Sequence, residues 1–174
     1  MTTASLLTRI PENTSFLQPT KFTFAFPTLP FLKYFCQTVI IPSVSTSAVT
    51  VASPFANMYR HGDKLEFGEL TVTALVDEDL RVYEESLNWL KALTKPNDYG
   101  QYIRQRQRDN STTPYHDAEL TINTNANVPN IRFKFTECHP VLIGQIDFDT
   151  KQNAMSTITI DITFRYDQFY IDRL

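Results

Sequence analysis

Three histidines are the residues of this sequence best suited to hold a metal ion. They are His61, His116 and His139, and none has a second histidine four residues away. Two ligands at that spacing would share one face of a helix, which is how helical zinc sites are built. The four glycines are too scattered to form a loop that cradles phosphate. The sequence therefore predicts neither a metal site nor a cofactor.

Acid–base and nucleophilic catalysis have only weak candidates. Asp147 and Asp149 alternate along a short apolar stretch, so on a strand both would share one face. Such a pair divides acid and base roles only when burial separates the two pKa values, and the pattern favours two solvated acids. Ser43, Ser45 and Ser47 lack the Gly-x-Ser-x-Gly elbow that presents a nucleophile. We therefore expect a protein that is not an enzyme.

Arg104, Arg106 and Arg108 recur at two-residue spacing in the polar segment 96–114. On an extended segment they would line up and grip phosphate or carboxylate groups. A solvated loop, or a donor of ion pairs to a second subunit, is the more common role of such a run. We expect this segment to be a loop.

Composition and charge limit the possible partners. The chain has 174 residues, a net charge of -3 and a sequence pI near 5.6. That size favours one domain, and the acidic balance argues against a chain that coats nucleic acid by neutralising phosphates. Cys36 and Cys138 lie far apart in apolar contexts, which predicts two reduced core residues. With no signal peptide and no membrane-length apolar run, we expect the protein in a cytosol or in a particle assembled there, with no membrane.

The elements that must position these residues are clearest between residues 66 and 95. Apolar and polar residues alternate over 70–76, as in a half-buried strand. Asp77 or Asp79 is expected to cap a helix that spans about 79–94. Its apolar stripe is predicted to be Leu80, Tyr83, Leu87, Leu90 and Leu93.

Trp89 lies beside that stripe and needs a second surface. We expect it to meet either a neighbouring subunit or the edge of its own barrel, so that Trp89→Ala would weaken assembly more than folding.

The segment between Val51 and Glu66 is predicted to be a long, irregular loop with a turn at Gly62. Loops of this length more often carry function than not. Its aromatic and charged residues are expected to contact another subunit or ring; the alternative is a loop folded back on its own domain. These residues are Phe55, Met58, Tyr59, Arg60, His61, Asp63 and Lys64.

The remaining segments predict a mainly β protein. Residues 1–20 form an expected arm, and 21–174 a single domain. We expect hairpins from 21–26 with 33–41 and from 118–124 with 131–137, and further strands at 44–51, 145–149 and 157–166. The predicted fold is mainly β with one α-helix, an antiparallel β-sandwich or barrel flanked by that helix.

Several runs resemble the tail-tube protein family of contractile-tailed bacteriophages. They are FCQTVIIPSVS, GDKLEFGEL, LTVTALVDEDLRVYEESLNWLKAL and CHPVLIGQIDFDTKQNAMSTITIDITFRYDQF. The likeness covers roughly residues 21–169 and rests on the order and spacing of these runs.

The resemblance implies a small β-barrel or sandwich with a helix, six-subunit rings, and rings stacked into a tube through which DNA passes. It also implies a place in the virion, assembly in the host cytoplasm, and tail partners such as sheath, baseplate or tail terminator. The long arm and the arginine segment would suit a ring at one end of the tube, such as a baseplate tube-initiator or a tail-completion protein. A monomeric β-barrel that binds a small ligand, and an enzyme that uses Asp147 and Asp149, are the alternatives from other classes.

Overall fold

The computed structural model of the protein describes residues 14–96, 98–109, 113–151 and 156–174. Most of the expected N-terminal arm lies outside this range, and residues 14–20 are exposed. The described chain contains nine strands and three helices: β1 (Phe22–Ala25), α1 (Pro30–Phe35), β2 (Cys36–Ile40), β3 (Val44–Ala52), β4 (Asn57–Phe67), β5 (Leu70–Leu75), α2 (Arg81–Thr94), α3 (Gly100–Asp109), β6 (His116–Asn123), β7 (Pro129–Ile143), β8 (Thr159–Arg165) and β9 (Gln168–Arg173).

Seven strands form the body, which is antiparallel throughout. Their order is β1-β6-β7-β8-β5-β2, and β9 pairs with β7. Strand β7 joins two halves of this sheet, one formed with β1, β6 and β9 and the other with β8, β5 and β2. Its residues 131–136 pair with β9, and its residues 139–143 pair with β8. The strand changes course at Glu137, a residue with a φ of 53°. The expected mainly β class with antiparallel sheets is confirmed, whereas the expectation of one helix is wrong.

The core lies between the two halves of this sheet. Leu120 of β6 and Phe135 of β7 face β5 and β8, whose alternating residues Leu70, Val72 and Ile162 are fully buried or nearly so. This is the period of two expected of strands with one buried face. The predicted strands at 70–76 and 157–166 are therefore present, as is the hairpin of β6 with β7.

Other pairings differ from the sequence expectation. Residues 30–35 fold as helix α1, so β1 and β2 do not form a hairpin; β1 pairs with β6 and β2 with β5. Strand β7 continues to Ile143, and residues 145–149, expected to be a strand, form none. The strand β9 was not expected. Alternation along a strand shows which face is buried, but it does not show which strand lies alongside.

Helix α2 packs on the core mainly by a face beside the predicted stripe, of which Tyr83 and Leu93 are only partly buried against the core. Leu80 precedes the helix in a left-handed conformation and is partly exposed, while Val82, Ser86 and Trp89 are buried. Ser86 is tolerated there because its hydroxyl donates to the Val82 carbonyl oxygen at 2.8 Å. The Asp77 carboxylate accepts the Arg81 N–H at 2.9 Å, as expected of an acid at the helix start.

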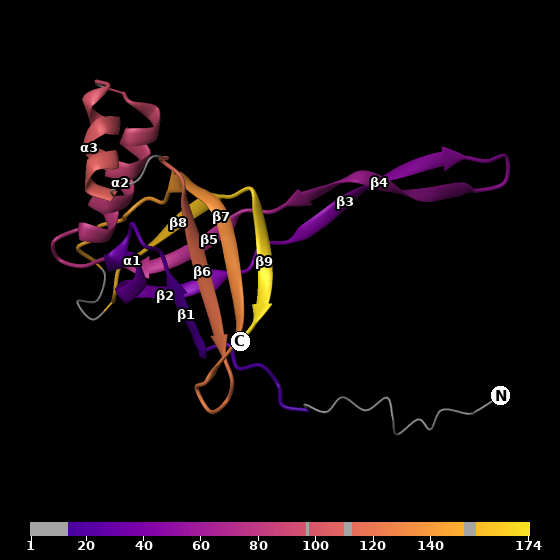
Figure 1. Ribbon diagram of the computed structural model, residues 1–174, viewed down its shortest axis with the longest axis horizontal. Helices are drawn as coiled ribbons and strands as arrows, with labels where there is room; N and C mark the ends of the chain where they lie inside the picture. The colour runs from indigo at the N-terminus through magenta and orange to yellow at the C-terminus, as the bar shows by residue number, and fades with distance from the viewer. Residues whose placement is uncertain (1–13, 97, 110–112, 152–155) are drawn as a thin grey trace.

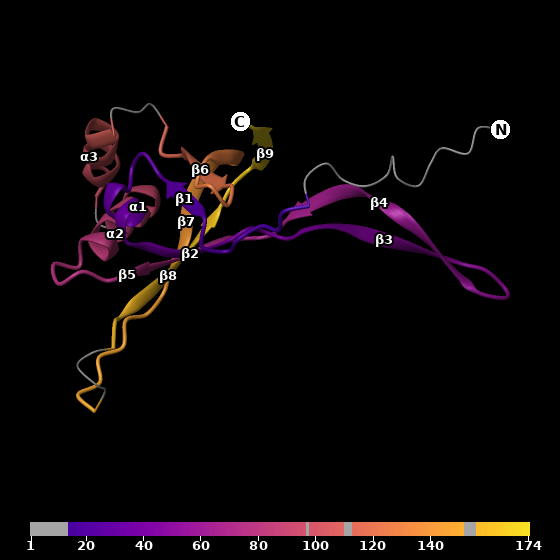
Figure 2. The same ribbon diagram turned by 90° about the horizontal axis from the view of Figure 1, so that it is seen from below.

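The helices and the β3–β4 pair lie at opposite ends of the molecule. Figure 1 shows α1, α2 and α3 gathered on one side of the sheet, and β3 and β4 projecting from the other side as a long arm. Figure 2, turned by 90°, shows the same separation. Because the two views agree, the arm extends away from the body in three dimensions.

Candidate assembly surface

We use the name β-ribbon for β3 and β4, which among the described strands pair only with each other. Every residue of β3 is exposed, and in β4 only Gly62 and Phe67 are not. An isolated two-stranded hairpin is marginally stable at best in water. Among the residues that the structure describes, the ribbon therefore lacks the packing that stabilises the rest of the sheet.

The ribbon contains one irregularity, opposite Gly62. The register shifts between Thr46 and Ala48, and a side chain at Gly62 would collide with the backbone oxygen of Ser47. Gly62 is thus required for the two strands to approach each other. The sequence suggested a turn at this position, which is wrong because a bulge leaves both strands extended.

All seven contact residues predicted between Val51 and Glu66 lie on the β-ribbon. They are placed by strand β4 and by the tip of the ribbon, and not by the irregular loop that was expected. Phe55 lies at the tip and is 99% exposed. Met58 and Arg60 alternate with Tyr59 and His61 along β4, so these two pairs occupy opposite faces. Asp63 and Lys64 lie nearer the body and are also exposed. The alternative of a loop folded back on its own domain does not hold, because these side chains contact no core.

Strands β1 and β2 are the two ends of the sheet order, so each has one edge without a neighbouring strand among the described residues. A groove of about 410 Å³ lies between them, lined mainly by apolar residues that include Leu17, Phe22, Val39 and Ile122. Unpaired edges of this kind are templates for strands of another chain.

Trp89 is not part of this surface. Its side chain is 0% exposed and lies against Phe26 and Phe164, with ring centroids 5.2 Å and 6.1 Å away. Its indole N–H donates to the Pro114 carbonyl oxygen at 2.8 Å. The prediction that Trp89 contacts a neighbouring subunit is therefore wrong: the second surface it requires is the barrel of its own chain.

The three arginines lie on helix α3 and not on an extended loop. Residues two apart on a helix point about 200° apart, so Arg104 and Arg106 cannot form one row. Arg104 is exposed beside α2, and Arg106 lies over the ring of Tyr102 at 5.7 Å. The side chain of Arg108 is outside the described residues. The expectation of a loop is therefore wrong for residues 100–109, the alternative of a three-arginine grip does not hold, and contact with another subunit stays a prediction for each residue.

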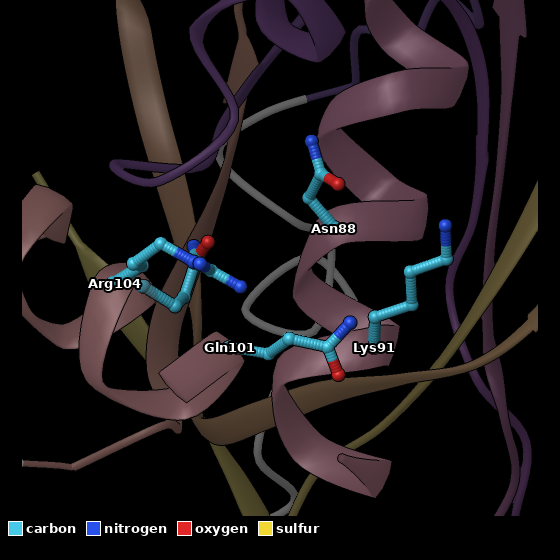
Figure 3. A pocket seen from close by; sticks show the side chains of 5 residues that line it. Asn88, Lys91, Gln101 and Arg104 are labelled. Atoms are coloured by element: carbon cyan, nitrogen blue, oxygen red, sulfur yellow. The ribbon is translucent and has the colours of Figure 1, made fainter. Parts of the chain in front are cut away.

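Helices α2 and α3 enclose a polar cleft, which we call the α2–α3 cleft. Asn88 and Lys91 of α2 and Gln101, Arg104 and Gln105 of α3 line a volume of about 320 Å³. Figure 3 shows the side chains of Gln101 and Arg104 extending from α3 toward α2. Sequence reasoning missed this cleft because it read α3 as a loop. One available signal was Asp98, whose carboxylate accepts the Gln101 N–H at 3.1 Å at the start of α3.

The titratable groups inside the fold act as structural residues. His116 Nε2 lies 3.4 Å from Asp109 Oδ2, and its ring packs on Trp89. Burial lowers the pKa of His116, and the Asp109 carboxylate partly offsets that effect. Burial also raises the pKa of the Cys36 thiol to about 11 and that of Cys138 to about 12, so neither is a ready nucleophile.

The other candidates for chemistry remain apart. Asp147 and Asp149 are exposed outside any strand, and each accepts a hydrogen bond from a residue two positions away. His61 is on the ribbon, whereas His139 packs against Tyr115. Within the described ranges no three His, Cys, Asp or Glu side chains gather to hold a metal ion. In that same part of the chain, no helix is long and apolar enough to cross a membrane.

Comparison with known proteins gives one family and several similar folds. The model of the family "phage tail tube protein" matches residues 10–172, while no curated protein sequence matches the chain. The tube-terminating cap of the anti-feeding prophage has a similar structure, with a TM-score of 0.66 and 10% identity, covering 98% of this chain and 99% of that chain.

Two further structures come from an extracellular contractile injection system, PVC. A chain of its extended sheath–tube complex has a TM-score of 0.57 and 12% identity, covering 100% of this chain and 99% of that chain. A chain of its extended sheath/tube terminator has a TM-score of 0.57 and 11% identity, covering 92% of this chain and 99% of that chain. At such identities the likeness is one of fold.

Proposed function

Because this chain belongs to the phage tail tube protein family, matched over residues 10–172, we propose that it forms hexameric rings that build or cap the inner tube of a phage tail. DNA passes through the lumen of the stacked rings. The protein is then a structural component of the virion, assembled in the host cytoplasm. Its partners are other copies of itself and neighbouring tail proteins such as sheath, baseplate or terminator.

The observation that carries this proposal is the β-ribbon. It exposes Phe55 at its tip and Met58 and Tyr59 on its two faces, and no other described part of the chain covers these side chains. Large exposed apolar groups gathered in one place mark interaction surfaces. A protruding element and a receiving surface on different parts of one chain make a heterologous contact, and such contacts close into rings or continue as stacks.

The free edges of β1 and β2 support the same proposal. A closed ring of subunits removes exposed strand edges, because each edge meets the next subunit. We therefore assign the ribbon residues Phe55, Met58, Tyr59, Arg60, His61, Asp63 and Lys64 to contacts between subunits or between rings. Arg104 and Arg106 are exposed candidates for further contacts on the helical side.

A ring at one end of the tube is the second candidate. One of the structures similar to this chain is described as a tube-terminating cap and has a TM-score of 0.66, compared with 0.57 for a chain of a sheath–tube complex. The number of copies per particle separates the two: many rings identify the tube proper, and one ring identifies an end piece. The small-ligand barrel has less support, because aromatic rings such as those of Phe135 and Tyr166, 5.1 Å apart, fill the interior.

Negative-stain images of the purified full-length chain test the proposal. We expect rings or short tubes, and we expect the double variant Phe55→Ser/Tyr59→Ser to stay folded but to lose them. The matched control is Tyr34→Ser/Phe148→Ser, which removes two exposed aromatic side chains from outside the ribbon. Monomers at every concentration, or ribbon variants that assemble as well as the control, would contradict the proposal.

A further inference from the structure

Two adjoining grooves follow the free edges of β1 and β2. One, of about 410 Å³, is lined by residues 37–39 of β2, and the other, of about 450 Å³, by residues 22–24 of β1. Phe22 and Gln37 line both grooves. Consecutive residues of a strand point to opposite faces, so a groove lined by three in a row borders the edge of the strand, where backbone N–H and C=O groups lie.

The larger part of the apolar lining belongs to the groove of about 410 Å³, which we call the β1–β2 groove. Its wall includes Leu120 and Ile122 of β6 and Val39 and Ile41 beside β2, and Lys21 is its one charged residue among those described. A fitting occupant therefore offers a backbone that pairs with a strand edge and apolar side chains on one face, as in strand addition.

Residues 1–13 have a sequence that suits such a groove. On a strand, Leu6 and Ile10 would share one face, and Leu7 and Arg9 would share the other. Burial of an unpaired arginine is costly, so the face with Leu6 and Ile10 is the one that suits an apolar wall. The threonines and serine of this segment are compatible with an extended strand of this kind.

The described chain leads from the groove away from the body. Leu17 lines both the β1–β2 groove and a hollow beside the β6–β7 turn, whereas Ser15 and Phe16 line that hollow and not the groove. Figures 1 and 2 both show the segment before β1 leaving the body on the side away from the helices. The described range begins at residue 14 on this outward course. Thirteen extended residues span about 40 Å, which is enough to reach a second molecule.

We propose that residues 1–13 of one copy of this chain dock as an added strand in the β1–β2 groove of a second copy. Leu6 and Ile10 lie against the apolar wall, and the backbone pairs with the free edge of β2. A second copy is the partner because the chain leaves its own groove in the outward direction. That the two copies belong to one ring or one stack rests on the proposed function; the docking itself does not.

Fluorescence anisotropy with the full-length chain, at a concentration where it is monomeric, tests the proposal. The probe is a peptide of residues 1–13 with fluorescein at its carboxyl end, and we expect it to bind the unmodified chain saturably. Leu6→Ser in the peptide should weaken binding by about tenfold or more, because the burial of one leucine side chain is lost. The matched control is Leu7→Ser, which should have little effect. A loss for Leu6→Ser no larger than that for Leu7→Ser would overturn the proposal.

Ile41→Ser in the protein tests the groove itself. Ile41 lines the groove and is 42% exposed, so its replacement should leave the fold intact. The matched control is Val141→Ser, which removes a β-branched side chain of 48% exposure from β7. We expect only Ile41→Ser to weaken peptide binding, with unchanged circular dichroism for both variants. Equal binding by the two variants would overturn the proposal. Competition by an unlabelled peptide of ribbon residues 51–58 as strong as that by residues 1–13 would also overturn it, and would make the β-ribbon the occupant.

The same assay distinguishes a second copy from the chain's own segment. We expect the unmodified chain and the full-length Leu6→Ser/Ile10→Ser variant to bind the peptide equally. Binding by the variant alone would show that residues 1–13 fill their own groove, and would overturn the proposal.

Ring formation gives an independent measurement. Leu6→Ser/Ile10→Ser should form fewer rings or short tubes in negative stain than the Leu7→Ser control, and equal assembly of the two would overturn the docking between copies. Absence of rings from the unmodified chain would count against the proposed function, while peptide binding would still decide the inference about the groove.

Discussion

Substitution of Trp89 by alanine separates a core role from an assembly role for helix α2. The side chain is 0% exposed and lies between Phe26, Phe164 and His116, with centroid distances of 5.2–6.1 Å. Its N–H is also the donor to the Pro114 carbonyl oxygen. Removal of the indole therefore leaves a cavity where the helix meets the sheet.

The magnitude follows from these contacts. Truncation of a fully buried Trp or Phe to Ala commonly costs about 3–5 kcal/mol, and the value rises with the cavity that remains. The Pro114 carbonyl oxygen loses its partner as well, which adds about 1 kcal/mol. For a domain of this length, each kcal/mol lowers the melting temperature by about 2–4 °C. We expect Trp89→Ala to lower the free energy of unfolding by about 4–6 kcal/mol, enough to unfold a marginal domain.

Urea unfolding of the full-length chain, followed by far-UV circular dichroism, measures this loss. The matched control is Trp89→Phe, which keeps most of the ring contacts but removes the hydrogen bond. It should cost about 1–2 kcal/mol. Both variants are compared at a concentration where the unmodified chain is monomeric, so that assembly does not contribute to stability.

A cost below about 1 kcal/mol for Trp89→Ala, together with lost ring formation, would refute this reasoning. Such a result would place the indole at a contact between subunits, as its position beside the predicted stripe first suggested. A large cost in the monomer confirms a core role. The aromatic neighbours then explain why α2 packs by the face that contains Trp89.

Three further predictions concern single groups. Gly62→Val should distort the bulge in the β-ribbon because the valine side chain collides with the Ser47 backbone. We expect the variant to keep a melting temperature within about 3 °C of the unmodified chain but to form fewer rings in negative stain. An unchanged number of rings would contradict this prediction. The raised pKa values of about 11 for Cys36 and about 12 for Cys138 predict slow alkylation by iodoacetamide at mildly alkaline pH; mass spectrometry should show rapid labelling only in denaturing urea, and equal rates in both states would count against burial of the thiols. Burial lowers the pKa of His116 from its ordinary 6.5, so the imidazole binds a proton more readily in the unfolded chain, and stability declines as the pH falls below 6.5. Urea midpoints measured above and below pH 6.5 should decline less for His116→Asn than for the unmodified chain. An identical decline in both proteins would exclude His116 as the cause.

The local pattern of the sequence determined the elements whose residues alternate against one buried face. Strands β5 and β8 and the β6–β7 hairpin lie where the alternation predicts them, as does most of α2. Each of these elements buries one face, so its apolar residues recur along the sequence at the spacing of a strand or a helix. Two of the four runs that carry the family resemblance contain β5, most of α2 and β8.

Only the tertiary structure decided which strands pair and which helix face is buried. Strand β1 pairs with β6 nearly a hundred residues away, and β2 with β5; no local pattern specifies such partners, because alternation is the same whichever strand lies alongside. Helix α3 packs on α2 through polar residues, so it lacks the apolar stripe by which helices are recognised.

The β-ribbon shows the same limit for the candidate site. Its aromatic and charged residues were predicted correctly as a group exposed on one segment, because their composition suits neither a core nor an ordinary solvated loop. Their strand geometry was not predicted, since no buried face imposes a period on a ribbon that is exposed on both sides. Trp89 is the opposite case: the sequence marked it as needing a second surface, and only the folded barrel, with Phe26 and Phe164 in contact, decided that this surface belongs to its own chain.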